Sequence, residues 1–170
     1  MVSAVSDGAE VMMRSTNLWA LALATLVACT PSSPLQGPGV DNDGALRTDA
    51  EGPFLVVATH TKVAKGERKL FDDHVEAIDA QLPAQDGFVA SSLRARMPGK
   101  ERWTMTVWES EEALLDFVVS GAHARAMGDS AVVLQGLFTA QWTVDRGDWP
   151  PTWDEALAEL DAVEPDPAFP

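Results

Sequence analysis

The chain has 170 residues, of which 46% are hydrophobic and 22% are charged, a balance typical of a globular protein with one domain and extensions. Its formal net charge of −14, from 12 Lys and Arg against 26 Asp and Glu, argues against nucleic-acid binding, because phosphate binding needs clustered positive charge. The same net charge predicts repulsion from an anionic membrane surface. A single cysteine excludes an internal disulfide bond and a thiolate metal cluster.

An uncharged apolar run covers residues 18–28 and ends at Cys29. The run is too short to span a bilayer, which takes about 20 apolar residues, but it has the length of a signal-peptide hydrophobic region, with Arg14 as its positive flank. Residues 26–29 (LVAC) resemble the lipobox of bacterial lipoproteins. The resemblance implies a signal peptide over residues 1–28, acylation of Cys29 and a lipid anchor in the bacterial cell envelope. The alternative is a buried N-terminal helix with an inert free cysteine.

The residues before the apolar run fit a signal peptide poorly. Asp7 and Glu10 place acidic groups where positive charge is favoured, and a start at Met12 or Met13 fits better. Thr30 follows the cysteine in place of an aspartate, which by resemblance to Gram-negative lipoproteins implies an outer-membrane destination.

Residues 29–53 are rich in proline and glycine and contain few side chains that a core could bury. This composition predicts a flexible tether that holds the folded part away from the bilayer. The predicted domain then covers residues 54–145, and an acidic C-terminal extension with a short helix follows over residues 146–170.

The first half of the predicted domain contains a strand, a helix and a second strand. Residues 54–61 are a short apolar run with β-branched side chains, which predicts a buried strand. A helix is expected from Gly66 to about Leu82, and an alternating second strand covers residues 88–97. The apolar face of this helix consists of Phe71, Val75, Ile78 and Leu82.

The second half repeats the pattern in the order strand, helix, strand. Residues 102–108 alternate between two faces, and Ser110 is a candidate N-cap of the helix that follows. After a break at Ser120 and Gly121, residues 123–127 form another helical segment, and a fourth strand covers residues 136–144. The acidic tail is expected to be a solvated face. The two faces of the third strand contain Trp103, Met105 and Val107 on one side and Thr104, Thr106 and Trp108 on the other.

The predicted order β-α-β-β-α-β is typical of an α+β protein with a ferredoxin-like, four-stranded antiparallel sheet. Both helices should then cover one face of the sheet and leave the other face bare. Apolar side chains on the last strand, among them Phe138 and Trp142, need a cover on that face. We therefore expect two chains to pack sheet to sheet about a two-fold axis as a homodimer.

Residues 106–114 (TVWESEEAL) and 120–127 (SGAHARAM) resemble the antibiotic biosynthesis monooxygenase (ABM) family of dimeric α+β barrels. The resemblance covers about residues 54–145. It implies a monooxygenase that needs no cofactor and oxidises small aromatic or quinone-like compounds in a cavity between the sheet and the helices. A non-catalytic module on the same scaffold, which binds a small ligand or is purely structural, is the alternative.

The heme-degrading members of the family use an asparagine, a tryptophan and a histidine, and this chain has Thr59, Phe117 and Met127 at the corresponding positions. None of the three matches, which argues against heme degradation. The cavity of the cofactor-independent members is expected to be lined here by Trp108, Thr59, Phe117, Met127 and His74.

His123 is the candidate catalytic base, because it follows the Gly121 break and an ordinary imidazole titrates near neutral pH. A structural or capping histidine is the alternative. His74 lies at the edge of the helix stripe and could equally be a boundary residue, while Trp108 could be a core residue. His60 is predicted to point away from Thr59, toward the other face of the sheet. The three histidines show no metal-ligand spacing.

Overall fold

The computed structural model describes residues 30–96 and 99–168. The predicted signal peptide over residues 1–28 and the predicted acylation site Cys29 lie outside the described residues. Within these two ranges, no helix is both long enough and apolar enough to cross a membrane.

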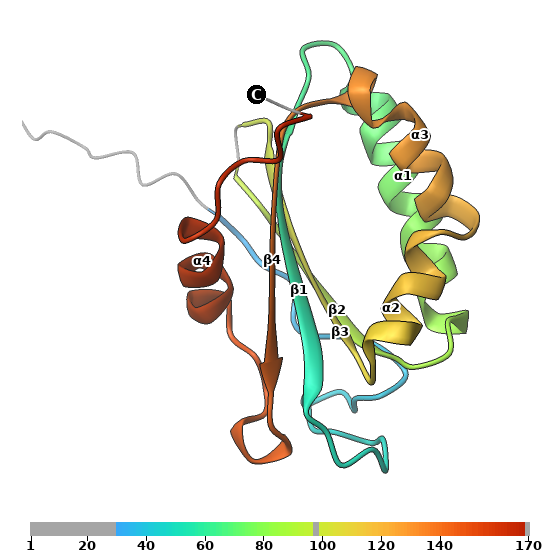
Figure 1. Ribbon diagram of the computed structural model, residues 1–170, viewed down its shortest axis with the longest axis vertical. Coiled ribbons are helices and arrows are strands. Elements are labelled where there is room, and N and C mark those ends of the chain that lie inside the picture. The colour runs from blue at the N-terminus through green and yellow to red at the C-terminus, as the bar shows by residue number, and fades with distance from the viewer. Residues whose placement is uncertain (1–29, 97–98, 169–170) are drawn as a thin grey trace, which may run out of the picture.

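A four-stranded antiparallel sheet in the order β2-β3-β1-β4 forms the centre of the domain (Figure 1). Its central strand β1 is the apolar run that the sequence predicts, and it pairs with β3 on one side and β4 on the other. The predicted ferredoxin-like α+β fold is therefore confirmed. The strands are β1 (Phe54–Val63), β2 (Phe88–Ala95), β3 (Glu101–Trp108) and β4 (Leu134–Val144).

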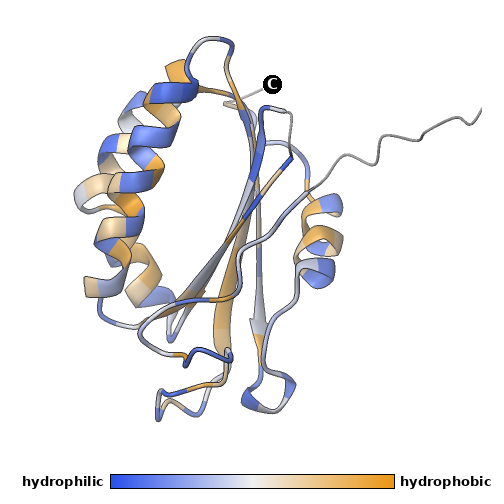
Figure 2. Cartoon of the chain, turned by 180° about the vertical axis from the view of Figure 1, so that it is seen from behind, coloured by the Kyte–Doolittle hydropathy of each residue, from blue (hydrophilic) through white to orange (hydrophobic). Residues whose placement is uncertain are grey.

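Three helices cover one face of the sheet (Figure 1). Ser110 is the N-cap of α2, as predicted, and its side chain accepts a hydrogen bond from the Ala113 N–H at 3.1 Å. The helices α1 and α2 are amphipathic, and Figure 2 shows hydrophobic and hydrophilic residues on the helical layer. They are α1 (Arg68–Gln81), α2 (Glu111–Val118) and α3 (Gly121–Val133), and a short 3-10 helix, η1 (Leu82–Ala84), follows α1.

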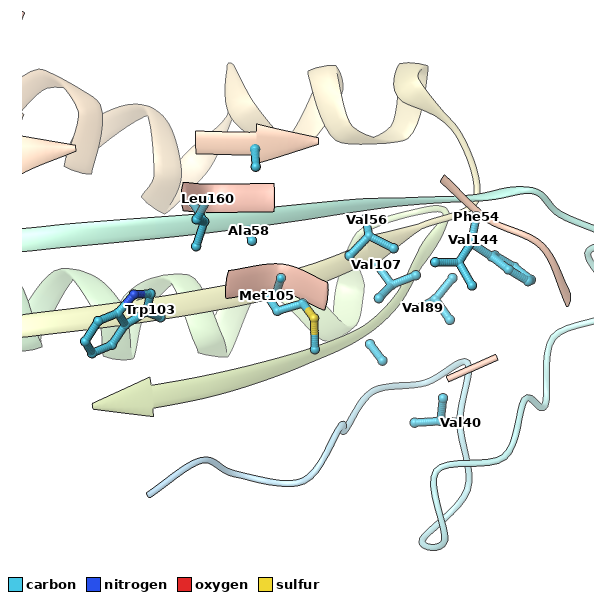
Figure 3. Packing of buried hydrophobic residues seen from close by; sticks show 13 residues of the cluster. Val40, Phe54, Val56, Ala58, Val89, Trp103, Met105, Val107, Val144 and Leu160 are labelled. Atoms are coloured by element: carbon cyan, nitrogen blue, oxygen red, sulfur yellow. The ribbon is translucent and has the colours of Figure 1, made fainter. Parts of the chain in front are cut away.

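The opposite face of the sheet carries the largest hydrophobic cluster, and α4 (Trp153–Asp161) covers it (Figures 1 and 3). Ala156 and Leu160 of this helix are 0% and 6% exposed, so the prediction of a solvated acidic tail is wrong for its apolar side. The physical reason is the helical spacing of Trp153, Ala156, Leu157 and Leu160, which places all four on the face toward the sheet. A second 3-10 helix, η2 (Arg146–Asp148), links β4 to α4.

Residues 31–47, which we call the strap, lie along the edge strand β2. The prediction of a flexible tether is wrong for these residues, because backbone hydrogen bonds join them to β2 and Val40 is 4% exposed. Gly37 and Gly39 allow this approach, since a Cβ on either would collide with Val89. The strap satisfies the backbone groups of an otherwise unpaired sheet edge. Its bonds to β2 include Ser33 N to Leu93 O, Gln36 N to Ser91 O and Gly39 N to Val89 O.

The strap and α4 together fill the place that the sequence assigns to a second chain. Val40, Ala156 and Leu160 belong to the same buried cluster as Trp103 and Met105 of the sheet (Figure 3). The reason for expecting a dimer, a bare sheet face, therefore does not hold. The homodimer stays a prediction that no contact in this single chain tests.

Candidate functional site

A cavity of about 360 Å³ lies between the sheet and the helical layer. Two small hydrophobic clusters, one around Trp108 and Phe117 and the other around Phe71 and Val133, pack between the same two layers without filling the space. The volume is at the lower end of the range of small-molecule sites, about 300–1,000 Å³. Because the space is not filled by side chains, the geometry argues against a purely structural role for this layer.

The floor of the cavity is a set of hydroxyl groups on the sheet. Thr104 of β3 and Thr139 of β4 lie on either side of Thr59 of β1 in the strand register. Thr59 and Thr104 form a hydrogen bond with each other, and Thr61 donates to the backbone oxygen of Arg102 at 3.2 Å. The polar residues of the wider floor are Thr59, Thr61, Ser91, Thr104, Thr106, Thr139 and Gln141, and the apolar Val57, Leu93 and Leu137 of the sheet also line the cavity.

The roof of the cavity is mostly apolar and comes from the helices. Ile78 of α1 and Phe117 of α2 stand over the floor, and Met127 of α3, 47% exposed, belongs to the wall. A ligand in this space would meet hydroxyl groups on one side and hydrocarbon on the other. This division suits a flat, largely apolar molecule with a polar group on one side.

His123 lines the cavity at the junction of α2 and α3. Gly121 begins α3 with φ +53, and the side chain of Gln81 from α1 accepts a hydrogen bond from the Ala122 N–H and donates to Ser120 at 3.3 Å. A side chain at position 121 would collide with Gln81, so the glycine is needed for this junction. The sequence prediction that the break turns His123 toward the cavity agrees with this placement.

The imidazole of His123 is held in one tautomer by the end of α2. Its Nδ1 lies 3.1 Å from the backbone oxygen of Val118, so Nδ1 carries the proton and Nε2 keeps a free lone pair. Burial lowers the pKa of His123 below its ordinary value of 6.5, and the hydrogen bond to Val118 opposes this shift only in part. At neutral pH the ring is therefore an uncharged base. It packs on Phe117, with ring centroids 4.7 Å apart.

His74 lines the cavity from α1. Its Nε2 lies 3.0 Å from a carboxylate oxygen of Asp129 on α3. The pair joins the two long helices of the roof, and Asp129 is largely exposed while His74 is mostly buried. His74 is thus both a boundary residue of the helix stripe and a cavity residue, so the two readings left open by the sequence apply together.

Trp108 does not line the cavity, and this part of the predicted pocket is wrong. Its indole is fully buried behind Phe117, with ring centroids 5.0 Å apart, and it also packs edge-on against Phe88. The Nε1–H donates to the Thr106 hydroxyl at 3.0 Å. The strand alternation places Trp108 on the correct face, but at the closed end of the layer, where the hydrophobic cluster surrounds it.

His60 lies on the other face of the sheet, as predicted. Its ring is stacked between Trp103 and Phe138, with centroid distances of 4.5 and 5.4 Å. It is therefore separated from His123 and His74 by the sheet itself. Among the residues that the structure describes, no three His, Cys, Asp or Glu side chains gather in a way that could hold a metal ion.

The structure brings together five of the residues that the sequence singles out: Thr59, His74, Phe117, His123 and Met127. Sequence reasoning missed the rest of the hydroxyl floor. The signal was present, because polar residues are spaced two apart on the strand faces that should meet the apolar helices. They are Thr59 and Thr61, Thr104 and Thr106, and Thr139 and Gln141. Polar residues on a face that ought to be apolar indicate a cavity.

The fold and this cavity define an α+β protein of ferredoxin-like topology with a cavity between sheet and helices. The chain belongs to the family described as "Domain of unknown function (DUF3291)", whose model matches residues 56–167. The matched range includes α4, so the C-terminal segment lies within the family domain.

Solved structures with the same fold come from several bacteria. PA3566 from Pseudomonas aeruginosa is 17% identical, with a TM-score of 0.51 over 55% of this chain and 96% of that one. A "putative monooxygenase" from Lactobacillus acidophilus NCFM is 14% identical, with a TM-score of 0.50 over 58% of this chain and 48% of that one. A "Putative monooxygenase (FN1347)" from Fusobacterium nucleatum is 13% identical, with a TM-score of 0.51 over 58% of this chain and 45% of that one.

These similarities establish the fold and confirm the ABM resemblance at that level. This chain spans less than half of the two proteins described as monooxygenases, and all three identities are low. A comparison with curated proteins finds no significant match.

Proposed function

We propose that the domain binds a small aromatic or quinol-like compound in this cavity and oxidises it with molecular oxygen, without a cofactor. The observation that carries the proposal is His123, an uncharged base with a free Nε2 in a mostly apolar cavity. Two proteins of the same fold that are described as monooxygenases support the reaction class. The hydroxyl floor would hold the oxygen substituents of the ring.

The reaction begins when Nε2 of His123 takes the proton of a phenolic hydroxyl group. The ring carbon para to the resulting phenolate gives an electron pair to oxygen and forms a C–O bond, and the terminal oxygen of this peroxide takes the proton back from His123. The O–O bond then breaks, the hydrogen on that ring carbon leaves as a proton, and water departs. One oxygen atom ends as a quinone carbonyl and the other as water, so the phenol is oxidised and O₂ is reduced.

Two of the histidines, His123 and His60, supply a matched pair of variants. His123→Ala should lower kcat for oxygen uptake by about 10²–10⁴-fold with a panel of phenols that carry a hydrogen para to the hydroxyl group, because it removes the general base. His60→Ala, on the other face of the sheet, should leave kcat near that of the wild type. Thermal unfolding of each variant separates loss of folding from loss of chemistry. Equal rates for His123→Ala and the wild type would contradict the proposal.

A binding module without catalysis is the second candidate. The observation that favours it is the hydrogen bond between Thr59 and Thr104, because these two hydroxyl groups of the floor already have a partner within the protein. In addition, His74 is paired with Asp129, so His123 is the one histidine in the cavity without a carboxylate partner in the described chain. In that case hydroquinones or quinones would bind with a one-to-one stoichiometry in anaerobic and aerobic buffer alike, with no oxygen uptake.

The proposal includes a lipid anchor in the bacterial cell envelope. It is supported by the uncharged run over residues 18–28 and by the lipobox-like residues 26–29. An acylated Cys29 would hold the domain at a membrane, where apolar quinone-like compounds concentrate. The mass of the N-terminal peptide recovered from membranes tests the acylation.

A further inference from the structure

We propose that one end of the domain docks on an anionic phospholipid surface, with the lipid anchor attached beside it. This end, which we call the basic end, is formed by the described residues of two segments, 62–69 on one side and 94–96 with 99–102 on the other. These two segments contain eight of the twelve Lys and Arg residues and two acidic residues. The basic residues are Lys62, Lys65, Arg68, Lys69, Arg94, Arg96, Lys100 and Arg102, and the acidic ones are Glu67 and Glu101.

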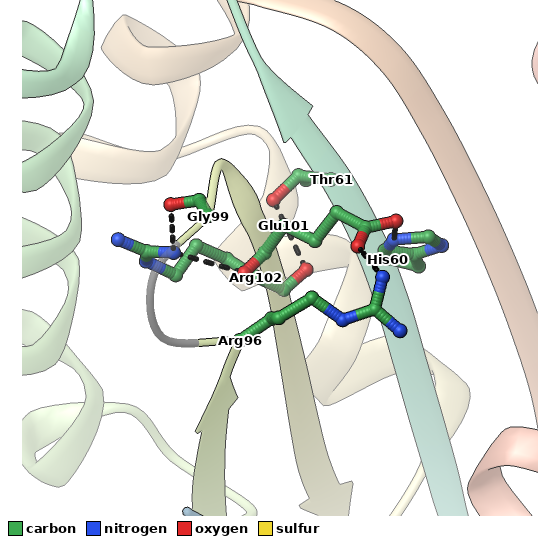
Figure 4. Close-up of polar contacts among 6 residues, drawn as sticks. All are labelled: His60, Thr61, Arg96, Gly99, Glu101 and Arg102. Carbon is green, nitrogen blue, oxygen red and sulfur yellow. Dashed lines mark hydrogen bonds and ion pairs between the residues drawn. The ribbon is translucent and has the colours of Figure 1, made fainter. Parts of the chain in front are cut away.

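The two segments are distant in sequence but adjacent in space. The Val63 N–H donates to the Lys100 oxygen at 3.0 Å, and Lys62 is the strand partner of Glu101. Figure 4 shows Arg96, Glu101 and Arg102 beside the end of β1, and in Figure 2 the ends of these strands are strongly hydrophilic. The β1–β3 pairing therefore brings basic residues from two separate segments of the chain to one end of the domain.

Several of these cations have partners within the domain. Lys62 lies over the Phe138 ring and Arg94 over the Trp153 ring, while Arg102 donates to backbone oxygens. Arg68 and Lys69 occupy the first turn of α1, where the positive end of the helix dipole disfavours cations. Each pairs with a carboxylate one turn later, and Arg96 pairs with Glu101 at 2.6 Å. Lys65 and Lys100 are exposed, and no ion pair with either is found in residues 30–96 and 99–168.

Acidic residues dominate the opposite end of the domain. Asp86, Glu109, Glu112 and Asp116 surround a shallow depression where β2 begins and β3 ends. Charges separated by more than the Debye length, about 10 Å at 0.1 M ionic strength, are largely screened from one another. The net charge of −14 therefore does not decide what the basic end meets, and the repulsion expected from composition alone does not apply to it.

The chain enters the fold at this same end. The Ala95 N–H donates to the Pro31 oxygen at 3.2 Å, and Ser32 pairs with Arg94. Cys29 precedes Pro31 by two residues, a span of about 7 Å when extended. This step rests on the proposed acylation of Cys29, which would then hold the basic end within that distance of the bilayer. Lipid anchors commonly act together with a basic patch, and Lys and Arg are attracted to anionic lipids.

The test uses the full chain, extracted from membranes and reconstituted into vesicles of phosphatidylglycerol with phosphatidylcholine, or of phosphatidylcholine alone. A fluorophore is placed at the basic end with Ala64→Cys, which removes no charge, or at η2 on the opposite end with Gly147→Cys, where an added Cβ meets no heavy atom within 4 Å. A quencher carried on lipid headgroups reports proximity to the surface. The mass of the N-terminal peptide reports the acylation of Cys29 separately.

In phosphatidylglycerol vesicles we expect quenching at position 64 to exceed that at position 147. The difference should shrink in phosphatidylcholine and in about 1 M salt, where the Debye length is about 3 Å and only the lipid anchor keeps the basic end near the surface. Lys100→Glu should lower the docked fraction relative to the undocked one by at least about fivefold. Arg125→Glu, which changes the net charge equally but lies on α3, should not.

Equal quenching at both positions, or no effect of Lys100→Glu, would overturn the docking surface even if Cys29 is acylated. An unmodified Cys29 together with binding to anionic vesicles that Lys100→Glu weakens and Arg125→Glu does not would overturn the anchor and support the docking surface. The two proposals thus fail through different measurements.

Discussion

Gly37→Ala tests whether the strap is a packed part of the domain. An alanine Cβ at this position would stand 2.6 Å from the Ala90 Cα and closer still to the Val89 oxygen, so the backbone must move. Overpacking of this kind costs about 1–3 kcal/mol. A shift of the strap also weakens the paired hydrogen bonds between Gln36 and Ser91, at 2.9 and 2.7 Å, each worth about 1 kcal/mol.

The free energy of unfolding should therefore fall by about 2–4 kcal/mol, measured by urea denaturation of the full chain. For a domain of this size the melting temperature falls by about 2–4 °C for each kcal/mol. The matched control is Gly147→Ala, because its Cβ would meet nothing within 4 Å, and it should change the stability by less than about 0.5 kcal/mol.

Hydrogen exchange at the Ser91 amide reports the same contact directly, since this N–H donates to the Gln36 oxygen at 2.7 Å. Exchange should be slow in the wild type and faster in Gly37→Ala. Unchanged stability together with a fast-exchanging Ser91 amide in the wild type would refute the packed strap. Residues 31–47 would then form the flexible tether that their composition predicts.

Burial lowers the pKa of His123 and of His60, although Glu101 opposes the shift at His60. Below pH 6.5 the unfolded chain then binds more protons than the folded chain, so the free energy of unfolding should fall as the pH drops toward the folded pKa values. Urea titrations from pH 5 to 8, roughly the range of histidine titration, measure this slope, and His123→Asn should reduce it. Leu160→Ala should lower the free energy of unfolding by about 2–5 kcal/mol, because it opens a cavity under α4. The control Glu159→Ala, at an exposed position of the same helix, should lower it by less than about 0.5 kcal/mol. A small effect of Leu160→Ala would show that α4 does not cover the sheet.

Patterns among residues that are close in sequence were sufficient to predict the helices and strands of the fold. Alternation in Trp103, Met105 and Val107 predicted β3, and the spacing of Phe71, Val75 and Ile78 predicted α1. Even the burial of α4 was readable from its apolar stripe, although its acidic composition obscured it. Local periodicity is visible in a chain because the side chains that share a face are three or four residues apart in a helix and two apart in a strand.

The candidate site was only half readable from the sequence. The Gly121 break pointed to His123, because a glycine with positive φ at a helix junction is a local feature. Trp108 was misplaced, because its position along the strand decides between the cavity and its closed end, and that depends on where α2 packs. The row formed by Thr104, Thr59 and Thr139 exists only through the register of three strands.

By itself the sequence determined the strands and helices, their order, and therefore the ferredoxin-like topology, since hydrophobic periodicity and turn residues act over a few positions. The tertiary structure alone decided that the strap pairs with β2, that α4 takes the place expected for a second chain, and that the basic segments around Lys65 and Lys100 meet at one end. Each of these depends on contacts between residues that are far apart along the chain, and no local pattern records which distant segments will lie side by side.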